Sequence, residues 1–368
     1  MNYFDKLKKE VSDAETGKAD QEPKSTAVDM EQKPSPAKKE KEKPAQKDII
    51  EHIKQQKPLV QKSHKTSNEF FLSQTVIKRV TDRGGEYREV CPRAFYEMYI
   101  QKAYREVTLP MLHGIYGETQ VLGGGAKGQK VTDLPRHKKT GEKLTAQLNI
   151  DEQVHRVPMW LNEKGISIIP GVNTQVPIVK RFDKNTLIAT EIDIFPSPFL
   201  HNGKFNLAVI DLKFTSDINT KFGSFCWGAP EFIDHIQADM TYWLLQDFDM
   251  ELNIKYNPEK EAIYRSIFEN DAISKMIEGE QIIFVYFIVG YKAQPLEEQR
   301  VFVIRSYRDP NGGLFRQNEW KERARKTLAQ IEEWKAKGWP PLEDTWCSKC
   351  PVSHTNGGYC KHDSLQVV

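Results

Sequence analysis

The sequence predicts a mixed α/β fold in which helices flank a single β-sheet. Three observations predict this class. Helical stretches alternate with β-rich stretches along the chain. Two of the β-rich stretches are joined by the turn-forming pair Asn202-Gly203. Finally, a charged amphipathic helix precedes a terminal segment that is rich in Pro, Cys and Gly.

The first 66 residues differ in composition from the rest of the 368-residue chain. They hold 15 Lys, no Arg and 12 Asp or Glu, with frequent Pro. Such a segment buries little apolar surface, so we expect a disordered charged tail, which is either a solvated linker or a partner-binding arm. Residues 67–368 are expected to form one domain, which includes a Cys-rich segment at 338–368.

The overall charge and hydropathy exclude several classes of protein. The formal net charge is only +2, so any nucleic-acid binding needs a local basic patch. No apolar run approaches the roughly 18 residues that span a bilayer, and the N-terminus lacks the apolar core of a signal peptide. We therefore expect a cytoplasmic, intracellular protein that does not bind membranes.

The expected domain begins with helices. Pro92 suits the first turn of a helix that continues through residues 95–100. Residues 101–122 are predicted to be helical, with an end at Gly123-Gly124-Gly125.

The remaining elements alternate between strands and helices. The predicted strands, rich in Val, Ile, Phe and Thr, are residues 165–179, 186–195, 206–214, 282–290 and 300–307. The predicted helices are residues 231–252 and 319–337. The strand pair 186–195 and 206–214 is expected to form a hairpin.

The two strands of this hairpin carry charged residues in otherwise apolar surroundings. Asp193 lies in TLIATEIDIF, and Asp211-Leu212-Lys213 lies in NLAVIDLKFT. A buried carboxylate is costly unless it is paired or binds a cation. Alternation places Asp211 and Lys213 on one face, and the hairpin brings Asp193 beside Asp211. The pattern predicts a site for a divalent ion such as Mg²⁺, with an edge-strand salt bridge as the alternative.

The cysteines form a second group of candidate metal ligands. Cys347 and Cys350 have the spacing that places two thiolates on one metal, Cys360 follows, and Cys91 lies far upstream. Four Cys ligands suit a 4Fe–4S cluster or Zn²⁺, and His354 and His362 also allow a Cys₃His zinc site. Cys226 has apolar neighbours and is expected to be a small buried residue.

A basic stretch follows the glycine-rich segment. Its cations are Lys127, Lys130, Arg136, His137, Lys138, Lys139 and Lys143. The stretch either contacts a phosphate backbone or is simply solvated. The segment Gly123–Gly128 is not a nucleotide-binding P-loop, because Gln129 stands where such a loop continues with Lys and then Ser or Thr.

The order of these motifs resembles the RecB-like branch of the PD-(D/E)xK nucleases. The matching features are Cys91-Pro92-Arg93-x-Phe95-Tyr96, an acid on the next helix, Asp193, Asp211-x-Lys213, a Gln-bearing helix and the terminal three-Cys cluster. More narrowly, the chain is similar to members with an iron–sulfur staple, namely the AddB nuclease domain and the CRISPR-associated Fe–S exonucleases. The resemblance covers residues 70–365 and implies a restriction-endonuclease-like mixed sheet flanked by helices, with a C-terminal Cys-rich metal staple.

The resemblance also implies roles for the matching residues. Asp193 and Asp211 would bind Mg²⁺ or Mn²⁺, Lys213 would be the catalytic lysine, and Gln237 would orient the site near DNA. The four cluster ligands would be Cys91, Cys347, Cys350 and Cys360, with Zn²⁺ as the alternative to a 4Fe–4S cluster.

Several positions depart from the family pattern. Glu118, in Gly114-Ile-Tyr-Gly-Glu118, stands where the family often carries His, and we assign it a metal-binding role because a carboxylate also binds Mg²⁺. His113 is adjacent but is expected to point about 100° away. Thr190 replaces a usual Gly, and Thr241 breaks a Gln-x-x-x-Tyr pattern.

The expected function is that of a metal-dependent DNA nuclease, an exonuclease of recombination, repair or replication, with a phage or mobile-element origin left open. Single- or double-stranded DNA is the expected partner. A helicase or recombination protein could bind the tail. The alternatives are a catalytically inactive nuclease-fold protein that binds DNA or acts as a scaffold, and a zinc-stapled structural protein.

Overall fold

The computed structural model describes residues 69–81, 90–101, 109–124, 130–137, 139–201, 203–216, 218, 221–222, 225–226, 236–278, 282–291, 299–305 and 315–342. Several sequence predictions lie outside these residues. They are the disordered tail at 1–66, Cys347, Cys350 and Cys360, the histidines His354 and His362, and the cations Lys127 and Lys138.

Six strands form one mixed sheet, which confirms the predicted mixed α/β class. They are β1 (Phe70–Leu72), β2 (Thr174–Arg181), β3 (Thr186–His201), β4 (Lys204–Thr215), β7 (Ile282–Gly290) and β8 (Gln299–Arg305). The order across the sheet is β1-β3-β4-β7-β8, and β2 also pairs with β3. Two short strands, β5 (Lys221–Phe222) and β6 (Phe225–Cys226), form a separate pair.

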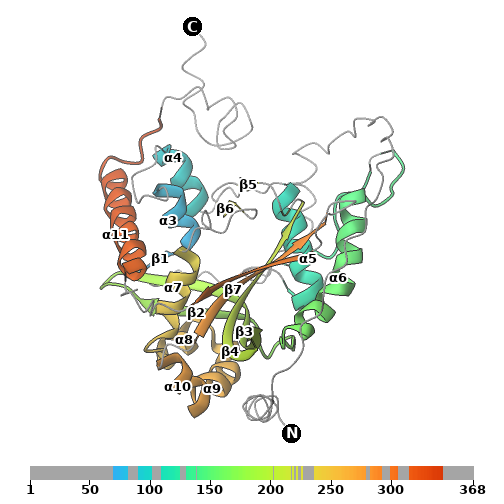
Figure 1. Cartoon of the computed structure of the whole chain (residues 1–368). Helices are drawn as coiled ribbons and strands as arrows, with labels where there is room; N and C mark the ends of the chain where they lie inside the picture. The colour runs from blue at the N-terminus through green and yellow to red at the C-terminus, as the bar shows by residue number, and fades with distance from the viewer. Residues whose placement is uncertain are drawn as a thin grey trace.

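Helices cover both faces of the sheet (Figure 1). They are α3 (Gln74–Val80), α4 (Pro92–Phe95), η1 (Tyr96–Ile100), α5 (Leu109–Leu122), α6 (Thr145–Glu163), α7 (Ile236–Leu245), α8 (Met250–Tyr256), η4 (Pro258–Lys260), α9 (Glu261–Phe268), α10 (Asp271–Glu278) and α11 (Phe315–Ala336). Helices α5 and α6 pack on one face, whereas α3, α7 and α11 lie on the other. Among the described helices, none has the length and apolar character needed to cross a membrane.

The predicted hairpin is confirmed as β3 and β4, which pair antiparallel from Ile194–Ile210 to His201–Lys204. The two-residue connection ends at Gly203, whose φ of +72° is a conformation that glycine adopts without strain. Strand β1 pairs with Thr186–Ile188 on the same edge of β3 that β4 occupies from Ile194 onward. Strands β1 and β4 therefore diverge along this edge of β3 and leave a fork between them, in which Asp193 lies.

Strand β7 is central, with β4 parallel on one side and β8 antiparallel on the other. All nine residues of β7 are buried, as its continuous apolar sequence IIFVYFIVG requires of a strand covered on both faces. The aromatic residues Phe284, Tyr286 and Phe287 are thus part of the core.

The helix predictions are confirmed in part. Pro92 lies in the first turn of α4, as predicted, and α5 ends at Leu122 with Gly123 at a φ of +82°. Of the helix predicted over residues 101–122, the structure describes Leu109–Leu122 as α5, whereas Gln101 is the C-cap of η1. Residues 102–108 are not described. The strand predicted from residue 165 begins only at Thr174, after a turn.

The single helix predicted over residues 231–252 is wrong. The described part consists of two helices, α7 and α8, with a break at Gln246–Asp249. Asp247 adopts a φ of +47°, and the Asp249 side chain accepts a hydrogen bond from the backbone N–H of Leu252, which caps α8. Helices α3, α6, α9 and α10 were not predicted, and α6 contains Pro158, which weakens a helical signal in the sequence.

Candidate active site

Asp211 and Lys213 lie on one face of β4, as strand alternation predicts. Their neighbours Ile210, Leu212 and Phe214 belong to the apolar cluster on the α5 side of the sheet. Lys213 Nζ is 2.7 Å from Asp211 Oδ2, and the Asp211 side chain is almost completely buried. Strand β4 pairs with β7 along this stretch, but its pairing with β3 ends at Ile210, so an edge-strand salt bridge remains the alternative interpretation.

Gln237 joins this pair from α7, the first described helix after the hairpin. Its Nε2 donates to Asp211 Oδ1 at 2.5 Å. The other carboxylate oxygen, Asp211 Oδ2, is buried and has no partner in hydrogen-bonding geometry, although the Lys213 ammonium is close to it. The contacts with Gln237 and Lys213 therefore hold both oxygens of this carboxylate in place.

Asp193 approaches from the fork in β3. Its Oδ2 accepts a hydrogen bond of 2.8 Å from the backbone N–H of Leu212, directly between Asp211 and Lys213. Burial raises the pKa of Asp193 well above its ordinary value. The carboxylates of Asp211 and Glu118 raise it further, against the opposite effect of Lys213. The predicted proximity of Asp193 to Asp211 is thus present in the structure.

Glu118 belongs to α5, which packs on the other face of the sheet from the side chains of Asp211 and Lys213. Glu118 is 9% exposed. It is near enough to act electrostatically on both Asp193 and Lys213. His113 points elsewhere, as predicted: its Nδ1 lies 3.2 Å from the hydroxyl of Tyr291, which follows β7. Burial lowers the pKa of His113 to about 4.

Lys213 is partly exposed, with 31% of its side chain accessible. Burial on its own lowers the pKa of this ammonium, but the carboxylates of Asp211, Asp193 and Glu118 outweigh that effect and raise the pKa above its ordinary value. Lys213 is therefore a cation at neutral pH, with one side open to solvent and the other against Asp211.

The oxygen donors of Glu118, Asp193 and Asp211 suit a hard divalent cation. Within the described ranges, however, no three or more His, Cys, Asp or Glu side chains are grouped so that they could hold a metal ion as they stand. The donor chemistry fits such a cation, whereas a preassembled three-ligand cage is not part of the described structure.

Cys91 is the only predicted cluster ligand that the structure describes. It precedes α4, and its Sγ lies 3.5 Å from the backbone N–H of Leu342. Leu342 is the last described residue and stands five positions before Cys347. The chain thus enters its Cys-rich segment beside Cys91, although the two segments are far apart in sequence.

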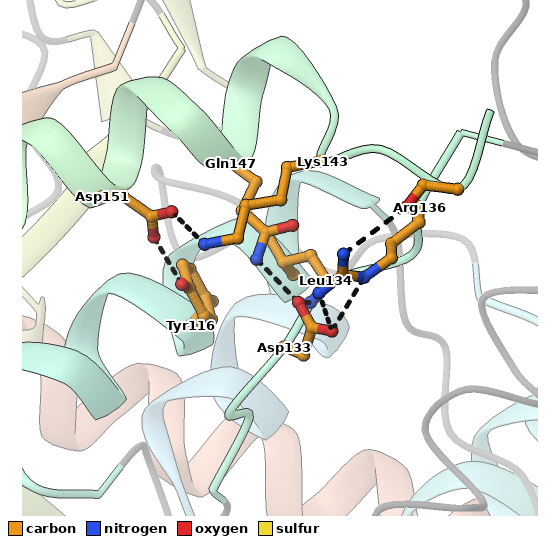
Figure 2. A network of polar contacts seen from close by, with 8 residues as sticks. Tyr116, Asp133, Leu134, Arg136, Lys143, Gln147 and Asp151 are labelled. Atoms are coloured by element: carbon orange, nitrogen blue, oxygen red, sulfur yellow. Dashed lines mark hydrogen bonds and ion pairs between the residues drawn. The ribbon is translucent and has the colours of Figure 1, made fainter.

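A network of polar contacts that the sequence did not reveal lies next to α5 (Figure 2). Asp151 of α6 accepts from the Tyr116 hydroxyl and pairs with Lys143 Nζ at 2.7 Å. Asp133 accepts from Gln147 of α6 at 2.7 Å and pairs with Arg136. Each of these side chains is unremarkable in sequence, because the contacts join residues of three separate segments.

Comparisons with known proteins assign no family. No family model matches the chain, and no curated protein matches it significantly. Among solved structures, a protein from Eubacterium rectale that is provisionally described as an exonuclease matches with a TM-score of 0.40 and 13% identity, over 78% of this chain and 88% of that one. At this level of similarity, the neighbour does not identify what this chain does.

Proposed function

We propose that the chain is a divalent-metal-dependent DNA nuclease, an exonuclease that hydrolyses phosphodiester bonds in recombination, repair or replication. The observation that supports this most directly is the environment of Asp211. One oxygen of this buried carboxylate is held by Gln237, and the other lies beside the Lys213 ammonium without a hydrogen bond. Asp193 is held in the adjacent fork by the Leu212 N–H.

A purely structural ion pair does not need this arrangement. Burying charged groups is costly, and an apolar replacement of similar volume is often at least as stable. Here burial, together with the nearby carboxylate of Asp211 on another strand, raises the pKa of Asp193. Such concentrations of perturbed groups are typical of functional sites.

The carboxylates of Asp193, Asp211 and Glu118 would hold Mg²⁺ or Mn²⁺. When bound, such an ion supplies an activated water and stabilises charge on the phosphate. Gln237 keeps the Asp211 carboxylate oriented, and Lys213 can place its ammonium against a phosphate oxygen or the attacking water. The partial exposure of Lys213 gives a substrate access to this group.

We further propose that Cys91, Cys347, Cys350 and Cys360 hold a 4Fe–4S cluster, with Zn²⁺ as the alternative. The contact of Cys91 with the N–H of Leu342 supports this. The five residues from Leu342 to Cys347 can span at most about 17 Å, so Cys347 lies within reach of Cys91. A cluster would then tie the start of the domain to its end.

The proposed activity can be tested with anaerobically purified protein and end-labelled single- or double-stranded DNA, in Mg²⁺, Mn²⁺ or EDTA. We expect metal-dependent degradation that Asp211→Asn abolishes. Asp247→Asn is the matched control, because Asp247 is 97% exposed and lies after the end of α7. The product ladder would give the polarity of an exonuclease.

A second candidate is a non-catalytic DNA-binding or scaffold protein with the same fold. The absence of a preassembled metal cage among the described side chains favours it. If wild-type protein with its cluster leaves every DNA substrate intact in both metals, the nuclease proposal fails. DNA binding that persists under those conditions would then support the scaffold function.

A further inference from the structure

The basic loop, residues 130–143, connects the region after α5 to the start of α6. Its apolar residues Val131 and Leu134 are buried in the same cluster as α5. The backbone N–H of Val131 donates to the Thr119 hydroxyl at 3.2 Å, and Thr119 directly follows Glu118. The loop therefore begins next to a candidate metal ligand.

Asp133 organises the first half of the basic loop (Figure 2). Its Oδ1 accepts from the backbone of Leu134 at 2.9 Å and from Gln147 at 2.7 Å, and its Oδ2 pairs with Arg136 at 3.2 Å. Burial on its own raises the pKa of Asp133, but these bonds outweigh it and lower the pKa. The carboxylate is thus charged and fully engaged.

The second half of the basic loop is also held by a carboxylate, that of Asp151 on α6. Lys143 Nζ lies 2.7 Å from Asp151 Oδ2, and the Tyr116 hydroxyl donates to Oδ1 of the same carboxylate. The turn between the halves is closed by the N–H of Gly141, which donates to the His137 carbonyl at 2.8 Å. The loop is therefore held to both α5 and α6 at several points.

These contacts divide the cations of the loop into two groups. Arg136 and Lys143 neutralise Asp133 and Asp151. Lys130 and Lys139 are exposed, and neither joins an ion pair with any residue that the structure describes. Two ammonium groups thus remain for a partner, on a loop that contacts α5 and α6 without any partner present.

We propose that the basic loop is a contact surface for the phosphate backbone of a nucleic acid, with Lys130 and Lys139 as the phosphate-binding groups. The proposal rests on the proposed nuclease function, because the loop adjoins Glu118 and would guide DNA toward the site. A flexible, merely solvated loop would not need the anchoring network. Two exposed cations on a loop that is anchored next to Glu118 are suited to hold a polyanion that the carboxylates alone would repel.

The test is equilibrium binding of the full chain, in EDTA, to short fluorescein-labelled single- and double-stranded DNA and to RNA of the same sequence, over a range of NaCl concentrations. The variant is Lys130→Gln combined with Lys139→Gln. The control combines Lys275→Gln on α10 with Lys326→Gln on α11, two exposed lysines on elements away from α5 and α6 (Figure 1).

For wild type and duplex DNA, we expect the logarithm of the binding constant to fall linearly with the logarithm of the NaCl concentration. The loop variant should reduce the magnitude of this slope by about 1.8, because each lost phosphate contact contributes about 0.9. The control variant should keep the wild-type slope. Weaker binding of DNA and RNA alike would show that the backbone is recognised. A selective loss for one of them would identify the nucleic acid that the loop serves.

Two other outcomes separate this inference from the nuclease proposal. If wild type degrades DNA with metal but the loop variant keeps its affinity and salt slope, the loop inference is overturned and the nuclease function stands. If neither wild type nor the variants degrade DNA, yet the loop variant binds with a smaller salt slope than wild type, the loop inference stands and the nuclease proposal fails. Wild type that binds no nucleic acid at low salt overturns the inference.

Discussion

Gly117 of α5 lies so close to Phe214 of β4 that a Cβ atom at position 117 would be 2.6 Å from the Phe214 ring. This approach sets how near α5 can come to β4, and therefore where Glu118 stands relative to Asp211 and Lys213. Gly114, one turn earlier on the same helix, has nothing within 4 Å of the corresponding Cβ position. The two glycines form a matched pair for a test.

Gly117→Ala is expected to destabilise the protein by about 1–3 kcal/mol, because the added methyl group overpacks a core contact. It should also lower nuclease activity, because α5 must shift away from β4 and take Glu118 with it. Gly114→Ala should instead stabilise the helix by up to about 1 kcal/mol. Urea unfolding and DNA degradation measured on both variants check this. Equal behaviour of the two would contradict the assigned role of Gly117.

Gln237→Leu is expected to reduce the rate of DNA cleavage about 10- to 100-fold, the range seen when a residue that orients a metal ligand is lost. The physical reason is that Asp211 Oδ1 loses its 2.5 Å hydrogen bond and the carboxylate can rotate. DNA affinity in EDTA should stay unchanged. Gln330→Leu on α11, where the side chain donates a hydrogen bond to Glu333, serves as the control. A parallel loss of DNA affinity would argue for a binding role instead.

The central site residues could be predicted because their geometry is local. Strand alternation places Lys213 beside Asp211, and the hairpin pairs Ile194 with Ile210, which brings Asp193 near Asp211. The register shift between Ile194 and Ser197 could not be predicted from the turn. The proximity of Gly117 to Phe214 could not be predicted, because it depends on the packing of a helix on a strand nearly a hundred residues later. The break between α7 and α8 was also missed, because the cap at Asp249 competes with a continuous helical pattern.

His113 is expected to make the stability of the protein depend on pH. Burial lowers its pKa to about 4 from the ordinary value of 6.5, so the folded state stays unprotonated while the unfolded state takes up a proton below 6.5. The contribution of His113 to the free energy of unfolding is therefore fully present above its pKa of 6.5 in the unfolded state, and it is lost as the pH falls toward 4. From pH 7 to pH 5 the loss is about 2 kcal/mol.

The measurement is the free energy of unfolding in urea at both pH values, for wild type and His113→Leu. Other titrating groups act on both proteins, so the difference between their pH dependences isolates His113. The variant should lose less stability than wild type on acidification. Equal losses would mean that His113 is not held neutral in the core beside Tyr291.

Asn253 of α8 is expected to protect the edge of the sheet. Its amide accepts from the Val179 N–H at 2.7 Å and donates to the Val179 carbonyl at 2.9 Å, so it pairs with β2 as a neighbouring strand would. Asn253→Ala would leave both buried backbone groups unsatisfied and should cost about 2–3 kcal/mol or more in unfolding free energy. Asn162→Ala, an exposed position on α6, should change stability by less than about 0.5 kcal/mol. Similar values for the two variants would contradict the edge-protecting role.

Cys91→Ser is expected to lower the metal content of the protein, because Cys91 lies where the chain enters its Cys-rich segment. Anaerobic purification followed by elemental analysis and visible absorbance distinguishes an iron–sulfur cluster from Zn²⁺. Cys226→Ser should retain the metal, since Cys226 is not among the proposed ligands. Losing the staple should also destabilise the protein, because the metal closes a loop of more than two hundred residues. Wild-type protein that carries neither iron nor zinc after anaerobic purification would refute the staple, whereas zinc alone would replace the cluster with a structural zinc site.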